Sequence, residues 1–187
     1  MVDMTGFEKI AAFLRKNTGK IAAAVVALLL VSLLSGISVK TIIIMALLML
    51  AASFSTFYFN YVVVPVNFEL VKLATILASV SYGLLPGLAV GIGSTFFGKV
   101  LIGRVDEKLP LSMLTISAIA VAAAIFSKAD VTALGITLVL AYNLTMLTLT
   151  QIMGGELAWN LPYEATNFVL NVFLFMKIAP LLKQLIM

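Results

Sequence analysis

Long apolar runs without a single charge constrain this chain most strongly. Ile21–Val39 is uncharged and bracketed by Lys20 and Lys40, and Thr41–Phe68 is also free of charge. The first run has about the length that an α-helix needs to cross a bilayer, roughly 20 residues. Of the 187 residues, 63% are hydrophobic and 11% charged, and a soluble fold of this size cannot bury so much apolar surface. We therefore expect an all-α integral membrane protein.

Breaks in the hydrophobic pattern predict a bundle of about six to seven transmembrane helices. The expected segments are Ile21–Val39, Thr41 to about Tyr58, Phe68–Leu84, Pro86–Ile102, Leu111–Ser127, Asp130–Ile152 and Leu161 to about Lys183. The second segment is expected to end in an apolar loop, because the residue before Pro65 is pushed out of helical geometry. Residues 21–187 are thus expected to form a single bundle of a multi-pass cell-membrane protein.

Residues 1–20 are expected to form an amphipathic helix on the membrane surface. Phe7, Ile10 and Leu14 recur at helical spacing, and Glu8 and Lys16 lie elsewhere on the helix. A signal peptide is the competing interpretation. The apolar stretch is long for that role, however, and shows no clear small-x-small cleavage site.

The residues that the chain lacks exclude several functions. Cysteine and histidine are absent, which removes thiolate chemistry, haem ligation by histidine and the usual zinc and copper sites, so no metal or cofactor is expected. The net charge of +4 is scattered and predicts no nucleic-acid binding. Paired carboxylates at a plausible spacing are also missing from the sequence pattern, and we expect neither catalytic residues nor an enzyme.

A glycine-rich segment has two interpretations. Gly93–Lys99 matches the phosphate-binding pattern G-x-x-x-x-G-K, but Val100 replaces the hydroxyl residue that would hold magnesium. Helix packing is the favoured interpretation, because Gly83, Gly87 and Gly91 recur every four residues. Such spacing clears one face of a helix for the close approach of a neighbouring helix in the membrane.

A polar stripe is expected along the last predicted helix. Its members are Asn160, Glu164, Asn167 and Asn171, spaced four, three and four residues apart. Placing such a stripe against lipid would cost free energy, because its polar groups would lack hydrogen-bond partners, so it should face a cavity or a partner helix. Trp159 and Tyr163 lie beside one end of it, where aromatic side chains either mark the membrane interface or contact a ligand.

Glu69 and Lys72 are charged residues near the start of the predicted helix Phe68–Leu84. They are three residues apart and could form an ion pair. Two interpretations stay open. The pair either anchors the start of its helix by extending towards the membrane interface or contacts a ligand.

Two stretches resemble a known family. Val64–Gly93 combines a proline-containing loop, an apolar helix and a glycine-rich turn and helix, and it resembles the substrate-binding S-components of energy-coupling factor transporters. Asn160–Asn167, continuing to Pro180–Lys183, is similar to the closing helix of that family, with a polar entry and a basic end. Together the similar regions extend over about residues 41–183.

The resemblance implies a six-helix bundle that captures a vitamin-like small molecule at its outer face and hydrolyses nothing. Uptake would require a membrane coupling subunit and separate ATPases. The positions implied to cap the pocket are Asn60, Tyr61 and Asn67, and those implied to line it are Gln151, Glu156, Asn160, Glu164 and Asn167. The helix that meets the coupling subunit would carry Ala46, Ala51 and Ala52.

A second hypothesis comes from a different functional class. The chain could be a structural or assembly subunit of a larger membrane complex, with the polar stripe against a partner protein and no small ligand. If a ligand exists, the aromatic and amide residues around Asn160, with Trp159 and Asn171 as further candidates, would suit a flat heterocycle with hydrogen-bonding edges.

Overall fold

The computed structural model describes residues 20, 26–27, 31–61 and 64–187. These residues form helices and their connections, and they include no strand. All of the predicted surface helix at 1–20 except residue 20, and residues 21–25 and 28–30 of the predicted span Ile21–Val39, lie outside the described residues. The chain divides into two compact units, residues 1–43 and 44–187. In the first unit, residues 31–35 are helical, and Gly36, with a φ of 67°, follows this helical segment.

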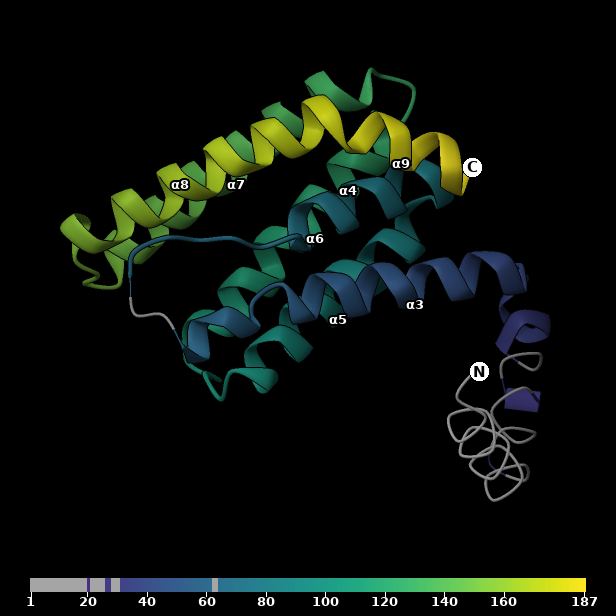
Figure 1. Ribbon diagram of the computed structural model, residues 1–187, viewed down its shortest axis with the longest axis horizontal. Coiled ribbons are helices and arrows are strands. Elements are labelled where there is room, and N and C mark those ends of the chain that lie inside the picture. Colours follow the sequence, from purple (N-terminus) through teal and green to yellow (C-terminus); the bar gives the residue numbers. More distant parts are fainter. Residues whose placement is uncertain (1–19, 21–25, 28–30, 62–63) are drawn as a thin grey trace, which may run out of the picture. The chain divides into compact units, whose positions relative to one another are not determined.

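Helix α3 (Val39–Phe54) begins in the first unit, and the helices that follow it along the chain belong to the second (Figure 1). They are the 3-10 helix η1 (Phe57–Asn60), α4 (Val71–Tyr82), α5 (Leu84–Leu101), α6 (Lys108–Ile125), α7 (Val131–Ile152), α8 (Leu157–Lys177) and α9 (Ala179–Ile186). Within the described residues, Val39–Asn60, α5, α6 and α7 are long and apolar enough to cross a membrane. The pair α8 and α9 adds a fifth candidate if the two count as one bent span.

The short helix α4 lies at the centre of the second unit. It contacts α5, α6, α7, α8 and α9, and all its residues from Val71 to Val80 are buried. Two of its buried hydroxyl groups are satisfied within the helix, because Thr75 Oγ1 donates to the Val71 carbonyl and Ser79 Oγ to the Thr75 carbonyl. The hydroxyl of Ser81, near the end of the helix, is buried without a partner in the described part of the chain. Hydrogen bonds of this kind satisfy Thr75 and Ser79 where the helix is enclosed by its neighbours.

Glycines allow α5 to approach α4 closely, as their spacing predicts. A Cβ at Gly87 would lie 1.9 Å from Ser79 Oγ, and one at Gly91 would lie 2.9 Å from Thr75 Oγ1. Gly83 is an exception, because it forms the turn between α4 and α5 with a φ of 93° and faces open space. Its role is therefore to allow the turn rather than to clear the packing face.

The phosphate-loop interpretation of Gly93–Lys99 is wrong for this structure. The whole segment lies inside the helix α5 rather than in a loop, so its amide groups are engaged in helical hydrogen bonds and cannot surround a phosphate. Gly93 and Gly98 instead face Met49 of α3 and Thr56 at the start of η1. These glycines make room for packing on the second side of α5.

The predicted helices differ from the observed ones at their ends. The second predicted segment ends at Phe54 rather than near Tyr58, and Leu111–Ser127 is observed as Lys108–Ile125. The segment Phe68–Leu84 is helical only from Val71 to Tyr82, so Glu69 precedes the helix. The last predicted helix begins earlier, at Leu157, and breaks at Ile178 with a bend of 51° between α8 and α9. Pro180 explains this break, since it has no N–H group to continue the helical hydrogen bonds.

Candidate functional site

The polar stripe of α8 faces the interior of the second unit, as its spacing predicts. Asn160 and Glu164 line a cavity, and Asn167 and Asn171, further along the helix, have fully buried side chains. The amide of Asn171 donates to the carbonyl and to the side-chain oxygen of Asn167, at 2.9 and 3.2 Å. The stripe therefore contributes both to the cavity and to the packed interior beyond it.

The cavity has a volume of about 230 Å³ and lies among η1, the start of α4 with the segment before it, helices α5 to α8 and the connection between α5 and α6. Its lining is Thr56, Phe59, Glu69, Val71, Ser94, Thr95, Gly98, Lys99, Ile102, Arg104, Asp106, Lys108, Ser112, Tyr142, Met146, Thr150, Trp159, Asn160, Tyr163 and Glu164. Pockets for drug-sized ligands measure about 300–1,000 Å³. This cavity suits a smaller molecule.

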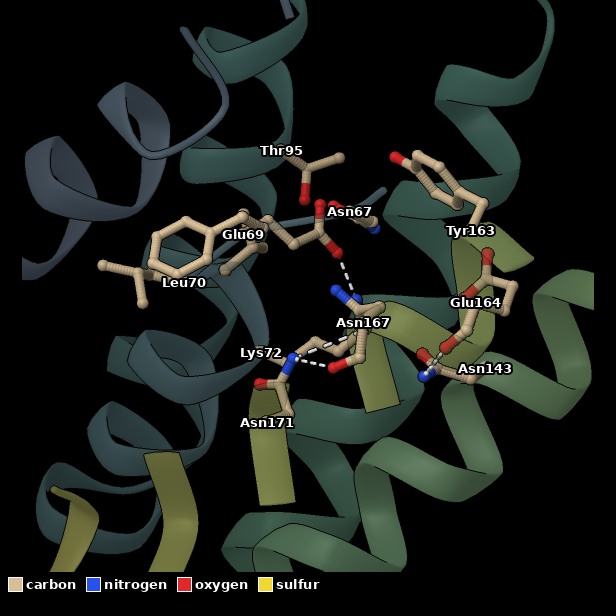
Figure 2. A network of polar contacts seen from close by, with 12 residues as sticks. Asn67, Glu69, Leu70, Lys72, Thr95, Asn143, Tyr163, Glu164, Asn167 and Asn171 are labelled. Carbon is tan, nitrogen blue, oxygen red and sulfur yellow. Dashed lines mark hydrogen bonds and ion pairs between the residues drawn. The ribbon is translucent and has the colours of Figure 1, made fainter. Parts of the chain in front are cut away.

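Several buried polar atoms at the cavity have no hydrogen-bond partner within the described part of the chain. They include Ser94 Oγ, Asn160 Nδ2 and Glu164 Oε2, all from cavity-lining residues. By contrast, the backbone carbonyl of Glu164 accepts a 3.1 Å hydrogen bond from the Asn143 amide (Figure 2). Nearly all buried polar groups in proteins find a partner, and the cost of leaving one without a partner is higher away from water. These atoms are therefore available to a polar ligand or to water.

A buried ion pair borders the cavity. Lys72 pairs with Glu69, and its side chain is only 1% exposed. Its ammonium also lies 4.2 Å from the centre of the Tyr142 ring, where the ring face attracts a cation. In Figure 2 a dashed line joins the Glu69 carboxylate to the Lys72 ammonium. Membrane-interface anchoring is thus the wrong interpretation for Lys72, because its side chain is enclosed by the bundle.

Basic side chains gather where α5 ends and α6 begins. Lys99, Arg104 and Lys108 all line the cavity, and Lys99 forms a 3.4 Å ion pair with Asp106. The Arg104 guanidinium lies 5.9 Å from the centre of the Phe59 ring. Arg104 itself is exposed, so this group of residues forms the outer end of the cavity.

Aromatic rings form part of the wall. The lining includes Phe59, Tyr142, Trp159 and Tyr163. The rings of Phe59 and Tyr163 are stacked, with centroids 6.0 Å apart, an arrangement that presents a flat apolar surface. Trp159 is 46% exposed and therefore lies at the mouth.

The structure brings only part of the predicted site together. Trp159, Asn160 and Glu164 line the cavity. Asn67 is buried beside α8, where its N–H donates to Thr166 Oγ1, but it is outside the lining. The predicted positions that are also outside the lining are Asn60, Tyr61, Gln151, Glu156, Asn167 and Asn171. Asn60, Tyr61 and Glu156 are exposed, since they lie in or next to the connections that flank η1 and α8.

Several lining residues were missed by the sequence-based prediction. Glu164 was predicted and ligand contact was left open for Glu69, but their meeting at one cavity was missed, because their separation in sequence gives no sign of paired carboxylates. The basic residues Lys99, Arg104 and Lys108 were also missed, and their concentration in a chain with few charges was a usable signal. Tyr142 carries no comparable signal, because a tyrosine in an apolar helix usually belongs to the core.

The loop before α4 is held against η1 by one tyrosine hydroxyl. Tyr58 Oη donates to the Val66 carbonyl at 2.8 Å and accepts from the Phe68 N–H at 2.6 Å. Tyr58→Phe is expected to speed hydrogen exchange of the Phe68 amide about fivefold, since each lost hydrogen bond is worth about 1 kcal/mol. Tyr61→Phe, at a 76% exposed position, is the control. Equal exchange rates in both variants would show that this hydroxyl does not hold the loop.

The comparisons with known proteins show no relative. No family model, curated protein or solved structure matches the chain. Its function is therefore inferred from its own residues and their geometry.

Proposed function

We propose that the protein is a membrane-embedded substrate-capture subunit for uptake of a small, vitamin-like molecule across the cell membrane. The cavity carries this proposal, because it combines an aromatic wall with buried polar atoms that have no partner in the described part of the chain. Ligand sites in membrane helical proteins have this composition, since polar groups there are costly unless a ligand or water engages them.

Capture fits the available chemistry better than catalysis does. The sequence contains no histidine or cysteine, the usual acid–base and nucleophilic groups. Glu69, one of the two glutamates in the lining, is engaged by Lys72. The lining residues can bind and orient a molecule through hydrogen bonds, charge and stacking.

Partner subunits belong to the same proposal. As in the S-components that the sequence resembles, a membrane coupling subunit and ATPases would supply the energy for uptake, in a bundle of six to seven spans. The apolar outer side of α3 supports such docking, because Leu47, Leu50 and Phe54 are each more than half exposed. Ala46 and Ala51 are also exposed on this helix, but Ala52 is fully buried and cannot take part.

Native mass spectrometry of the protein in mild detergent tests the proposal. The wild-type protein is expected to carry a small molecule, and an Asn160→Leu, Glu164→Leu variant is expected to lose it, because two buried polar contacts are removed. Leu161→Ala is the matched control, since Leu161 belongs to the same helix but is exposed and outside the lining. Thermal unfolding of each variant separates loss of the ligand from loss of the fold.

The rival hypothesis predicts a different spectrum. A structural or assembly subunit would be free of small molecules, or would be found only with other polypeptides. Either result, with the wild-type protein still folded, would overturn the capture proposal.

A further inference from the structure

The charges along the cavity lining differ between its inner and outer parts. The inner part carries Glu69 and Glu164, and the only cation paired with them among the described residues is Lys72, which pairs with Glu69. Among the described residues Glu164 forms no ion pair, and its Oε2 atom is buried without a hydrogen-bond partner there. A buried carboxylate in this situation favours a ligand that brings a cation or a charged N–H donor.

The outer part has the opposite charge. Lys99 is balanced by Asp106, but Arg104 and Lys108 form no ion pair among the described residues. Arg104 is exposed and Lys108 partly so, which places them at the entrance, whereas Glu164 Oε2 is shielded from solvent. A guanidinium and an ammonium at an entrance attract and orient an anionic group.

From this arrangement we infer that the captured substrate is a small, flat zwitterion, with a basic nitrogen group on Glu164 and an acidic group towards Arg104 and Lys108. The inference rests on the proposed capture function and adds the chemical class of the substrate. The stacked rings of Phe59 and Tyr163 favour a planar body between the two charged ends. The cavity volume of about 230 Å³ suits a single-ring molecule.

Three probes with the same ring size but different charges test the contribution of each charged end to binding. They are para-aminomethylbenzoate, which is zwitterionic, benzylamine, which has only the cation, and para-methylbenzoate, which has only the anion. Binding is measured by calorimetry on the protein in nanodiscs of uncharged phosphatidylcholine, so that lipid charges contribute nothing. The zwitterion is expected to bind at least tenfold more tightly than either singly charged probe, the factor expected for one charged hydrogen bond.

Two variants test which charged groups of the protein contact each end of the zwitterion. Glu164→Gln is expected to weaken the binding of the zwitterion and of benzylamine about tenfold and to leave the affinity for para-methylbenzoate unchanged. The double variant Arg104→Gln, Lys108→Gln is expected to weaken the binding of the zwitterion and of para-methylbenzoate and to leave the affinity for benzylamine unchanged. The inference is overturned if the anionic probe binds as tightly as the zwitterion, or if Glu164→Gln leaves all three affinities unchanged.

The co-purifying molecule decides the case in which none of the probes binds. Tandem mass spectrometry identifies its functional groups. A molecule with both a basic and an acidic group supports the inference, and one that lacks either group overturns it while the capture function stands. If neither a probe nor a co-purifying molecule is bound, the capture function fails, and the substrate inference fails with it.

Discussion

Replacing Glu69 by glutamine is expected to lower the free energy of unfolding by about 3–5 kcal/mol, the usual cost of removing one partner from a buried ion pair. The substitution leaves the ammonium of Lys72, whose side chain is only 1% exposed, without an anion. The Tyr142 ring at 4.2 Å offsets only part of this cost, since a cation–π contact is worth about 0.5–2 kcal/mol. Unfolding in mixed micelles with increasing dodecyl sulfate measures the difference.

Two further variants make this test specific. Adding Lys72→Met to Glu69→Gln removes both charges, and most of the lost stability is expected to return because no unpaired ion is left in the interior. Asp106→Asn breaks the more exposed pair with Lys99 and is expected to cost less than about 1 kcal/mol. If Glu69→Gln is no more costly than Asp106→Asn, Lys72 is not held as a buried cation.

Replacing Gly135 by alanine is expected to destabilise the protein by about 1–3 kcal/mol, the usual cost of overpacking a core. Helix propensity predicts the opposite sign, since alanine is favoured over glycine by about 1 kcal/mol within a helix. A Cβ at Gly135 would lie 2.0 Å from Cδ1 of Phe175, which is fully buried. Helices α7 and α8 run side by side (Figure 1), and the buried Phe175 ring would have to move to make room for the Cβ.

Thermal unfolding with two companion variants distinguishes packing from propensity. Phe175→Leu is expected to restore part of the stability in the Gly135→Ala background, because a smaller side chain relieves the clash. Ala141→Val adds bulk to the exposed side of the same helix and is expected to change the stability by less than about 0.5 kcal/mol. A Gly135→Ala variant more stable than the wild type would contradict the close packing of α7 and α8.

The helical part of the fold was largely predictable, because charge-free runs of bilayer length have few alternatives to a helix. The segments predicted at Pro86–Ile102 and Asp130–Ile152 correspond closely to α5 and α7. The end of the last predicted helix was less predictable. A helix can either continue through a proline with a kink or end there. Here Pro180 follows the bend of 51° between α8 and α9.

The inward direction of the polar stripe on α8 also followed from local spacing. Asn160, Glu164, Asn167 and Asn171 share one side of an ideal helix wherever that helix is placed. Spacing could not tell which of them border a cavity and which are enclosed. That distinction depends on tertiary packing: α4 and α7 contact α8 directly, whereas α5 and α6 contribute residues to the cavity lining.

Some features of this protein are set by local sequence, and others arise only when segments that are distant in sequence pack together. Apolar run lengths, the absence of histidine and cysteine, and the spacing on α8 are local properties, and they established the helical class and the inward polar face. The charged lining depends on tertiary packing, because Glu69, Arg104 and Glu164 come from three separate parts of the sequence. Helix packing brings these side chains to one cavity, and no periodicity within a single helix encodes that proximity.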